Sequence, residues 1–215
     1  MQFVDPKPMP KDKMDFSKIV KVITDMIIWL VTSDDTNPVT REGICDARRQ
    51  QMLREMHILD MSFEVGQLPL MDTTLDKMTN FTRRLPSAAP FSLKDLETKQ
   101  SRAIPANAKL HHMILLSLRL ARNILNDNTA NRLYVMKMGY VPLMLTQLGY
   151  ALKVAPTLTE VFSDNELLLE RVDEETIMVF INLIKATGRE ARYVDFLVTL
   201  CRANGKAVRP NQWKV

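Results

Sequence analysis

Apolar residues recur at helical spacing along most of this 215-residue chain. Near the N-terminus, steps of three and four positions bring a group of them onto one face of a helix of about four turns. These residues are Phe16, Ile19, Val20, Ile23, Ile27, Leu30 and Val31. The pattern predicts an amphipathic helix whose apolar face is covered by other parts of the fold.

A second helix is predicted to begin near Asp46, because its carboxylate can accept a hydrogen bond from a free backbone N–H group. Gly66 is placed to end this helix in a left-handed conformation. The apolar stripe between them consists of Met52, Met56, Leu59 and Phe63. Between the two helices, Asn37-Pro38 and Gly43 indicate a loop over residues 33–44.

The pattern is weaker in the middle of the chain. Residues 67–84 predict at most a short helix through Leu75 and Met78. Three prolines then bracket a polar stretch, and we expect residues 85–106 to form a long, mobile loop that could contain one helical turn.

The second half carries denser helical patterns, and Gly139, Gly188 and Gly205 are each expected to close a helix. In total the chain predicts roughly eight to ten helices and no strand, which is typical of helix bundles and α-solenoids. No exact internal repeat is visible, so an α-solenoid would be irregular. We therefore expect an all-α fold of stacked antiparallel helices. Residues 1–14 would form a tail, residues 15–212 one continuous domain, and residues 213–215 a short end.

Composition and charge narrow the class of protein. Hydrophobic residues make up 46% of the chain and charged residues 25%, as in a globular domain and not a disordered one. The net charge of +4 is too small to indicate nucleic-acid binding. Cys45 and Cys201 form no disulfide or zinc motif and favour a reducing compartment. The longest apolar run, residues 26–31, falls far short of the roughly 20 residues of a membrane span.

No catalytic constellation is visible in the sequence. His57, His111 and His112 are the only histidines, and the adjacent pair would point about 100° apart on a helix, too far to hold one metal ion. No glycine pattern forms a phosphate-binding loop, and no motif resembles a nucleophile elbow. The sequence therefore predicts no enzyme, no metal site and no cofactor.

Arginines gather around the start of the second predicted helix. They are Arg41, Arg48, Arg49 and Arg54. Such a cluster is most often a solvated helix face, and the alternative is a binding surface for an anion or an acidic partner.

Three segments resemble a known family of domains. Residues 46–55, followed by Ile58-Leu59, are similar to the "R-x-R-Q-x-L-x-R-E-x-x-I-L" segment of inositol trisphosphate receptors. Residues 187–197 resemble a segment near the end of the same module, and residues 204–212 are similar to the "N-G-x-A-V-R-x-N-Q" stretch of ryanodine receptors. Together they resemble the RIH domain, the helical homology domain shared by both channel types, over residues 15–212.

The resemblance implies an armadillo-like α-solenoid in the cytosolic part of a tetrameric calcium-release channel. Such a channel lies in the membrane of the endoplasmic reticulum or another internal calcium store, with its pore outside this sequence. Because the family's chain runs on into further helices after Asn211-Gln212, we expect the sequence to be a piece of a larger protein. The implied partners are other domains of the same channel and neighbouring subunits.

The resemblance also allows a prediction of whether this domain binds inositol trisphosphate. In the ligand-binding copy of the domain, three basic positions on one helix and a basic triplet before a later helix contact the ligand. Here the first set aligns with Ala47, Gln51 and Arg54, and the second with residues 128–130, which leaves one cation. A trisphosphate requires several charge-assisted hydrogen bonds, so we do not expect this domain to bind it.

The resemblance instead implies a rigid module that relays conformational change between domains towards the pore. The 85–106 loop and the face of Arg48, Arg49 and Arg54 would then be candidate contacts with neighbouring domains or subunits.

Two alternatives remain open. The domain could be an inositol-phosphate-binding module of the same channel family, with the ligand held by Arg48, Arg49, Arg54 and Arg132. It could also be an unrelated armadillo-type scaffold that binds an extended peptide in a groove, although the tryptophans do not form the ladder that such a groove favours.

Overall fold

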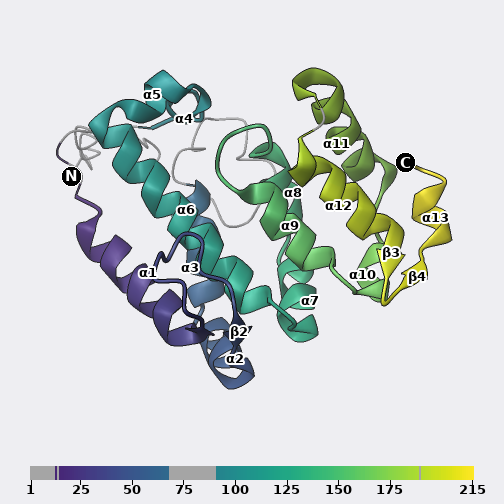
Figure 1. Ribbon diagram of the computed structural model, residues 1–215, viewed down its shortest axis with the longest axis horizontal. Helices are drawn as coiled ribbons and strands as arrows, with labels where there is room; N and C mark the ends of the chain where they lie inside the picture. Colours follow the sequence, from purple (N-terminus) through teal and green to yellow (C-terminus); the bar gives the residue numbers. More distant parts are fainter. Residues whose placement is uncertain (1–12, 14, 68–90, 189) are drawn as a thin grey trace, which may run out of the picture.

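The computed structural model describes residues 13, 15–67, 91–188 and 190–215 (Figure 1). The predicted tail over residues 1–14 lies almost entirely outside them. The short helix predicted through Leu75 and Met78 and the first part of the predicted loop, residues 85–90, also lie outside the described residues.

The first half of the fold is built on α6 (Pro105–Leu125), the longest helix in the described part of the chain. Helices α1 (Ser17–Leu30) and α3 (Ile58–Gln67) pack along it, and α2 (Ala47–Glu55) contacts it as well. Twelve of the 21 residues of α6 are buried, so neighbours cover it on more than one side. In Figure 1 this teal helix crosses the molecule between purple α1 and green α9.

The apolar stripe predicted on the first helix is covered only in part. Ile23, Ile27 and Leu30 of α1 are buried against the core, as the pattern predicts. Ile19, however, leaves 44% of its surface exposed. The N-terminal half of α1 therefore keeps part of its apolar face open.

The loop predicted over residues 33–44 is present, and a short hairpin closes it. Strand β1 (Val31–Thr32) pairs antiparallel with β2 (Ile44–Cys45). The pattern predicts no strand, because strands of two residues are too short to show the alternation that reveals one. The Arg119 side chain of α6 holds the loop in place, because it donates to the Val39 carbonyl and to Glu42, each at 2.8 Å.

The predicted second helix is in fact two helices. Asp46 caps α2 as expected, and its Oδ1 accepts the Arg49 N–H at 3.0 Å. The helix then ends at Glu55 and α3 begins at Ile58, because His57 between them has a φ of +60°. A right-handed helix cannot contain that conformation. The sequence does not predict it, because a histidine, unlike a glycine, is not typical of a left-handed position.

The described part of the predicted 85–106 loop is more helical than the one turn that the sequence allowed. Residues 94–97 form α4 (Lys94–Glu97), residues 99–103 form α5 (Lys99–Ala103), and α6 already begins at Pro105. Thr98 and Ser101 make a capping box in which each side chain bonds the backbone N–H of the other. Serine replaces the usual glutamate of this motif, so the sequence does not show a capping box at the start of α5.

The second half of the fold consists of shorter helices and one more hairpin. Its elements are α7 (Thr129–Lys137), α8 (Tyr140–Thr146), α9 (Val154–Phe162), α10 (Glu166–Leu169), α11 (Glu174–Thr187), α12 (Ala191–Cys201), β3 (Arg202–Ala203), β4 (Lys206–Ala207) and α13 (Arg209–Gln212).

Two of the four glycines that were expected to end helices do so. Gly139 and Gly188 follow α7 and α11 with φ of +77° and +87°, which confirms both predictions. Gly66 instead lies inside the last turn of α3, where its carbonyl accepts a hydrogen bond from Gln147 at 2.7 Å. Gly205 does not close α12 but forms the turn between β3 and β4.

The apolar core continues from the first half into the second. Helix α9 packs against both α6 and α12, and α11 packs against α12. Phe196 of α12 stacks on Phe180 of α11 at 3.8 Å between ring centroids, and meets Phe162 of α9 edge-on at 5.8 Å. The order of the helices in space thus broadly follows their order in the chain (Figure 1). The architecture confirms the predicted all-α fold.

A buried carboxylate ties the break between α2 and α3 to the second half. Asp60 is 4% exposed and accepts hydrogen bonds from the Tyr140 hydroxyl at 2.6 Å and the Tyr134 hydroxyl at 2.9 Å. Nδ1 of His57 lies 2.9 Å from the same carboxylate. Burial, together with the hydrogen bond to Asp60, raises the pKa of Tyr134 to about 12.

This raised pKa predicts a loss of stability in alkaline solution. An unfolded tyrosine ionises near pH 10, whereas folded Tyr134 keeps its proton until about pH 12. The stability that the hydroxyl contributes is therefore present below pH 10 and lost as pH rises towards 12. We expect the difference in unfolding free energy between wild type and Tyr134→Phe to shrink across this range in urea titrations. A pH-independent difference, or the same trend for Tyr150→Phe outside the cluster, would contradict the assignment.

Candidate functional site

Three of the four arginines proposed from the sequence lie on α2, and the fourth lies on α7. Arg48 is exposed, Arg49 and Arg54 are half-buried, and Arg132 is buried. The structure therefore does not present these four side chains as one cationic surface.

Arg49 is held against the end of α1. Its guanidinium lies 4.7 Å from the centre of the Trp29 ring and donates a hydrogen bond to the Trp29 carbonyl. This carbonyl lies in the last turn of α1, where backbone oxygens lack partners within the helix. Asp46 lies 3.9 Å from the same guanidinium. Trp29 nevertheless keeps 40% of its surface exposed, so ring and guanidinium are both available to a partner.

Arg54 faces the start of α7. Its guanidinium donates to Oδ1 of Asn131 at 2.9 Å, and Glu55 lies 3.9 Å away. Arg41, the remaining arginine of the sequence cluster, donates to the Val31 carbonyl at 2.9 Å and so holds the 33–44 loop. Both guanidinium groups are thus engaged in contacts within the fold.

Arg132 forms a buried ion pair that joins three helices. Its guanidinium lies 2.5 Å from the carboxylate of Glu160 on α9. It also donates to the carbonyl of Leu125 at 3.1 Å and to that of Ser163 at 2.7 Å. Because its side chain is only 6% exposed, we leave Arg132 out of the candidate surface.

The structure brings together the two places that correspond to ligand contacts in the resemblance. Asn128 caps α7, and its side-chain amide donates to Gln50 of α2 at 3.0 Å. The three aligned positions on α2 hold Ala47, Gln51 and Arg54, and Gln51 donates to Glu55 at 2.8 Å. Among these positions and residues 128–130, Arg54 is the one cation.

Apolar side chains near the start of α2 are also exposed, although the sequence pattern places one of them, Met52, on a predicted core stripe. Ile44 of β2 is 79% exposed and Met52 of α2 is 42% exposed. With Trp29, Arg48 and Arg49 they form a surface that we call the arginine face. Tryptophan, methionine and arginine are the residues enriched in protein interfaces. Met52 lies on the predicted apolar stripe, which indicates a buried side chain. In the structure, however, α2 turns this side of the stripe to solvent.

An apolar groove lies on the same helix as Trp29. Its volume is about 250 Å³, its walls are α1 and α3, and its floor is α6. Its lining includes Ile19, Val22, Met26, Met61, Val65 and Leu120. On α1 the exposed stripe steps from residue 19 to 22, 26 and 29, so the groove leads towards the arginine face.

A family model for the RIH domain, named after ryanodine and inositol trisphosphate receptors, matches residues 20–215. The chain belongs to the RIH domain family. This result confirms the resemblance seen in the three sequence segments. The family belongs to intracellular calcium-release channels.

Within the described residues, this RIH domain gathers no group of three or more histidine, cysteine, aspartate or glutamate side chains that could hold a metal ion. His111 bonds the Ala151 carbonyl at 2.8 Å, and burial lowers its pKa. Burial raises the pKa of Cys45 to about 11 and raises that of Cys201. Both thiols are therefore protonated at neutral pH. In the described part of the chain, no helix combines the length and apolar character that crossing a bilayer requires.

The buried position of Arg132 predicts a structural role for it. Arg132→Met should lower the unfolding free energy by about 3–5 kcal/mol, because it leaves Glu160 buried without its partner. The double variant Arg132→Met/Glu160→Leu should recover most of that loss, since both charges are then absent. Urea unfolding of the three proteins measures the difference.

Arg48→Met is the matched control, because Arg48 is exposed and a surface substitution changes stability by roughly 0.5 kcal/mol or less. If Arg132→Met costs no more than Arg48→Met, the ion pair is not structural and Arg132 returns to the list of ligand candidates.

Proposed function

We propose that this RIH domain is a non-catalytic interaction and relay module in the cytosolic part of a ligand-gated intracellular calcium-release channel. It receives movement from one neighbouring domain and passes it to another, towards the pore. Its partners are other domains of the same channel and neighbouring subunits.

The observation that carries this proposal is the shortage of cations between α2 and α7. These two elements are in contact, so the fold offers the right place for an inositol phosphate. Arg54 is the one cation at the aligned positions, and its guanidinium is engaged with Asn131. Inositol trisphosphate has several phosphates that need charge-assisted hydrogen bonds, and this arrangement supplies too few.

The packing of α6 supports the relay part of the proposal. Helix α6 contacts α1 and α3 in the first half and α9 in the second, and α9 in turn contacts α12. The buried Arg132–Glu160 pair fixes α7 to α9. Close-packed interiors transmit displacement because they have few voids to absorb it. A push on α1 is therefore expected to move α12 as part of one body.

The arginine face supports the interaction part. Trp29 and Arg49 are already held together by their cation–π contact, so little side-chain entropy is lost when a partner covers them. Met52 and Ile44 beside them offer apolar surface that is otherwise exposed to water. A neighbouring domain or subunit that covers this face would bury both the Trp29–Arg49 pair and the apolar side chains of Met52 and Ile44.

The experiment is calorimetric titration of the protein with inositol trisphosphate at low and at physiological salt. We expect no saturable heat up to millimolar ligand. Arg54→Ala and Arg209→Ala serve as a matched pair, because Arg209 is an exposed arginine on α13, remote in the sequence from α2 and α7.

Micromolar, salt-sensitive binding that Arg54→Ala abolishes and Arg209→Ala leaves intact would contradict the proposal. The domain would then be an inositol-phosphate-binding module that uses Arg54 together with cations outside the aligned positions.

A further inference from the structure

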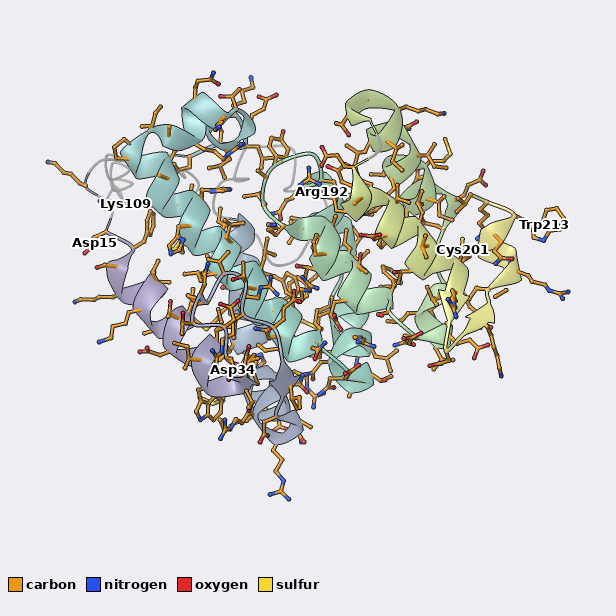
Figure 2. The ribbon with its side chains drawn as sticks, viewed as in Figure 1. Asp15, Asp34, Lys109, Arg192, Cys201 and Trp213 are labelled. Atoms are coloured by element: carbon orange, nitrogen blue, oxygen red, sulfur yellow. The ribbon has the colours of Figure 1, made fainter. Side chains whose placement is uncertain are left out.

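A second apolar groove lies at the C-terminal end of the fold, between α12 and the elements that follow it. Its volume is about 540 Å³. Its apolar lining includes Val194, Leu197, Val198, Cys201, Ala207 and Val215. We call it the C-terminal groove. In Figure 2, Cys201 marks α12 beside this groove, and Trp213 projects away from the ribbon at the same end of the molecule.

The segment that resembles ryanodine receptors builds one wall of the groove. Asn204 and Gly205 both have positive φ, +50° and +78°, as a tight two-residue hairpin turn requires. The turn folds β4 back onto β3, so that Gly205 and Ala207 face α12 across the groove. Buried Asn211 then fixes α13, because its amide donates to the carbonyls of Leu169 at 2.9 Å and Leu200 at 3.0 Å. The wall is thus held by the core and is present before any partner binds.

The exposed side of α12 has the pattern of a helix-packing surface. Phe196 and Leu200 point into the core, whereas Val194 is 38% exposed and Val198 is 58% exposed. Val194, Val198 and Cys201 are spaced i, i+4 and i+7 and form a ridge along the helix. A second helix can pack against such a ridge.

The rim of the groove is positively charged. All the lining residues fall within residues 194–215, which contain Arg202, Lys206, Arg209 and Lys214 against a single carboxylate, Asp195. Lys214 donates to the Val172 carbonyl at 3.0 Å. The other three cations are exposed, and none of them forms an ion pair within the described residues.

We propose that the C-terminal groove binds an acidic amphipathic helix from a neighbouring domain or subunit. Apolar side chains of that helix would cover the ridge on α12, and its carboxylates would pair with Arg202, Lys206 and Arg209. The proposal names the kind of partner that the relay module contacts at this end, and in that sense it rests on the proposed function.

Shape and charge favour this occupant over two others. A groove between a helix and a hairpin is concave, as the docking site of a helix is, whereas a bilayer surface is flat. A second copy of this chain, docked symmetrically, would bring the same three cations of each rim together and be repelled.

The test uses two synthetic 16-residue peptides with the 215-residue chain. One peptide is an amphipathic helix with leucines on one face and glutamates on the other, and the second has lysine in place of every glutamate. We expect the glutamate peptide to bind with a micromolar Kd that weakens as salt rises, and the lysine peptide not to bind. Bound peptide should also slow alkylation of Cys201, which lines the groove, and leave that of Cys45 unchanged.

Two variants locate the binding. Val198→Asp places a charge on the exposed ridge and should weaken binding at least roughly tenfold, because it puts a carboxylate against the apolar face of the peptide. Arg202→Glu/Lys206→Glu should weaken it in a salt-dependent way. Val22→Asp, in the groove between α1 and α3, is the control and should bind like wild type.

Several outcomes would overturn the proposal. They are equal binding of both peptides, no binding of the glutamate peptide, or unchanged binding by Val198→Asp. Sedimentation that shows a dimer lost in Val198→Asp would identify a second copy as the occupant, and binding of anionic vesicles in place of the peptide would identify a membrane surface. None of these results depends on inositol trisphosphate, so they leave the calorimetric test of the proposed function separate.

Discussion

Helix α6 buries side chains against helices from both halves of the chain, and the rest of the structure depends on that packing. Met113, Ile114, Leu118 and Ile124 are at most 1% exposed. Each such side chain contributes about 1.5–3 kcal/mol when it is removed from water. Helices α1, α3 and α9 cover them, and α9 carries the core on to α12. The groove between α1 and α3, with α6 as its floor, is left open by this packing.

Much of the fold follows from the sequence, because amphipathic helices with a clear period need only a core to pack against. The stripes on α1, α6 and α12 fall in this class, as do the left-handed glycines after α7 and α11. The break at His57 was not predictable in the same way, because it depends on Asp60 meeting Tyr134 and Tyr140 from distant parts of the chain. Helix α5 gives no clear sequence signal because serine stands in for the usual glutamate of its capping box, and α4 has only four residues and no side-chain cap.

The candidate surfaces were harder to predict than the fold. The sequence indicates arginines as candidate binding residues. The charge of an arginine, however, does not determine whether its guanidinium faces solvent or a buried partner. Arg132 turned out to meet Glu160, 28 positions further along the chain, and Arg49 to lie on Trp29. Likewise, Met52 lies on a helical stripe that predicts a core, and only the packing of α2 leaves this side chain exposed. Exposure is a property of the assembled helices and not of any local pattern.

The central claim is that these helices move as one body, and native-state hydrogen exchange tests it most directly. If the claim holds, the slowest amides of α1, α6, α9 and α12 exchange with the same free energy, and that value equals the free energy of global unfolding. If α11 and α12 instead open at a lower free energy while α1 and α6 stay protected, the two halves are separate units. A movement received at α1 would then not reach α12, and the relay would be contradicted.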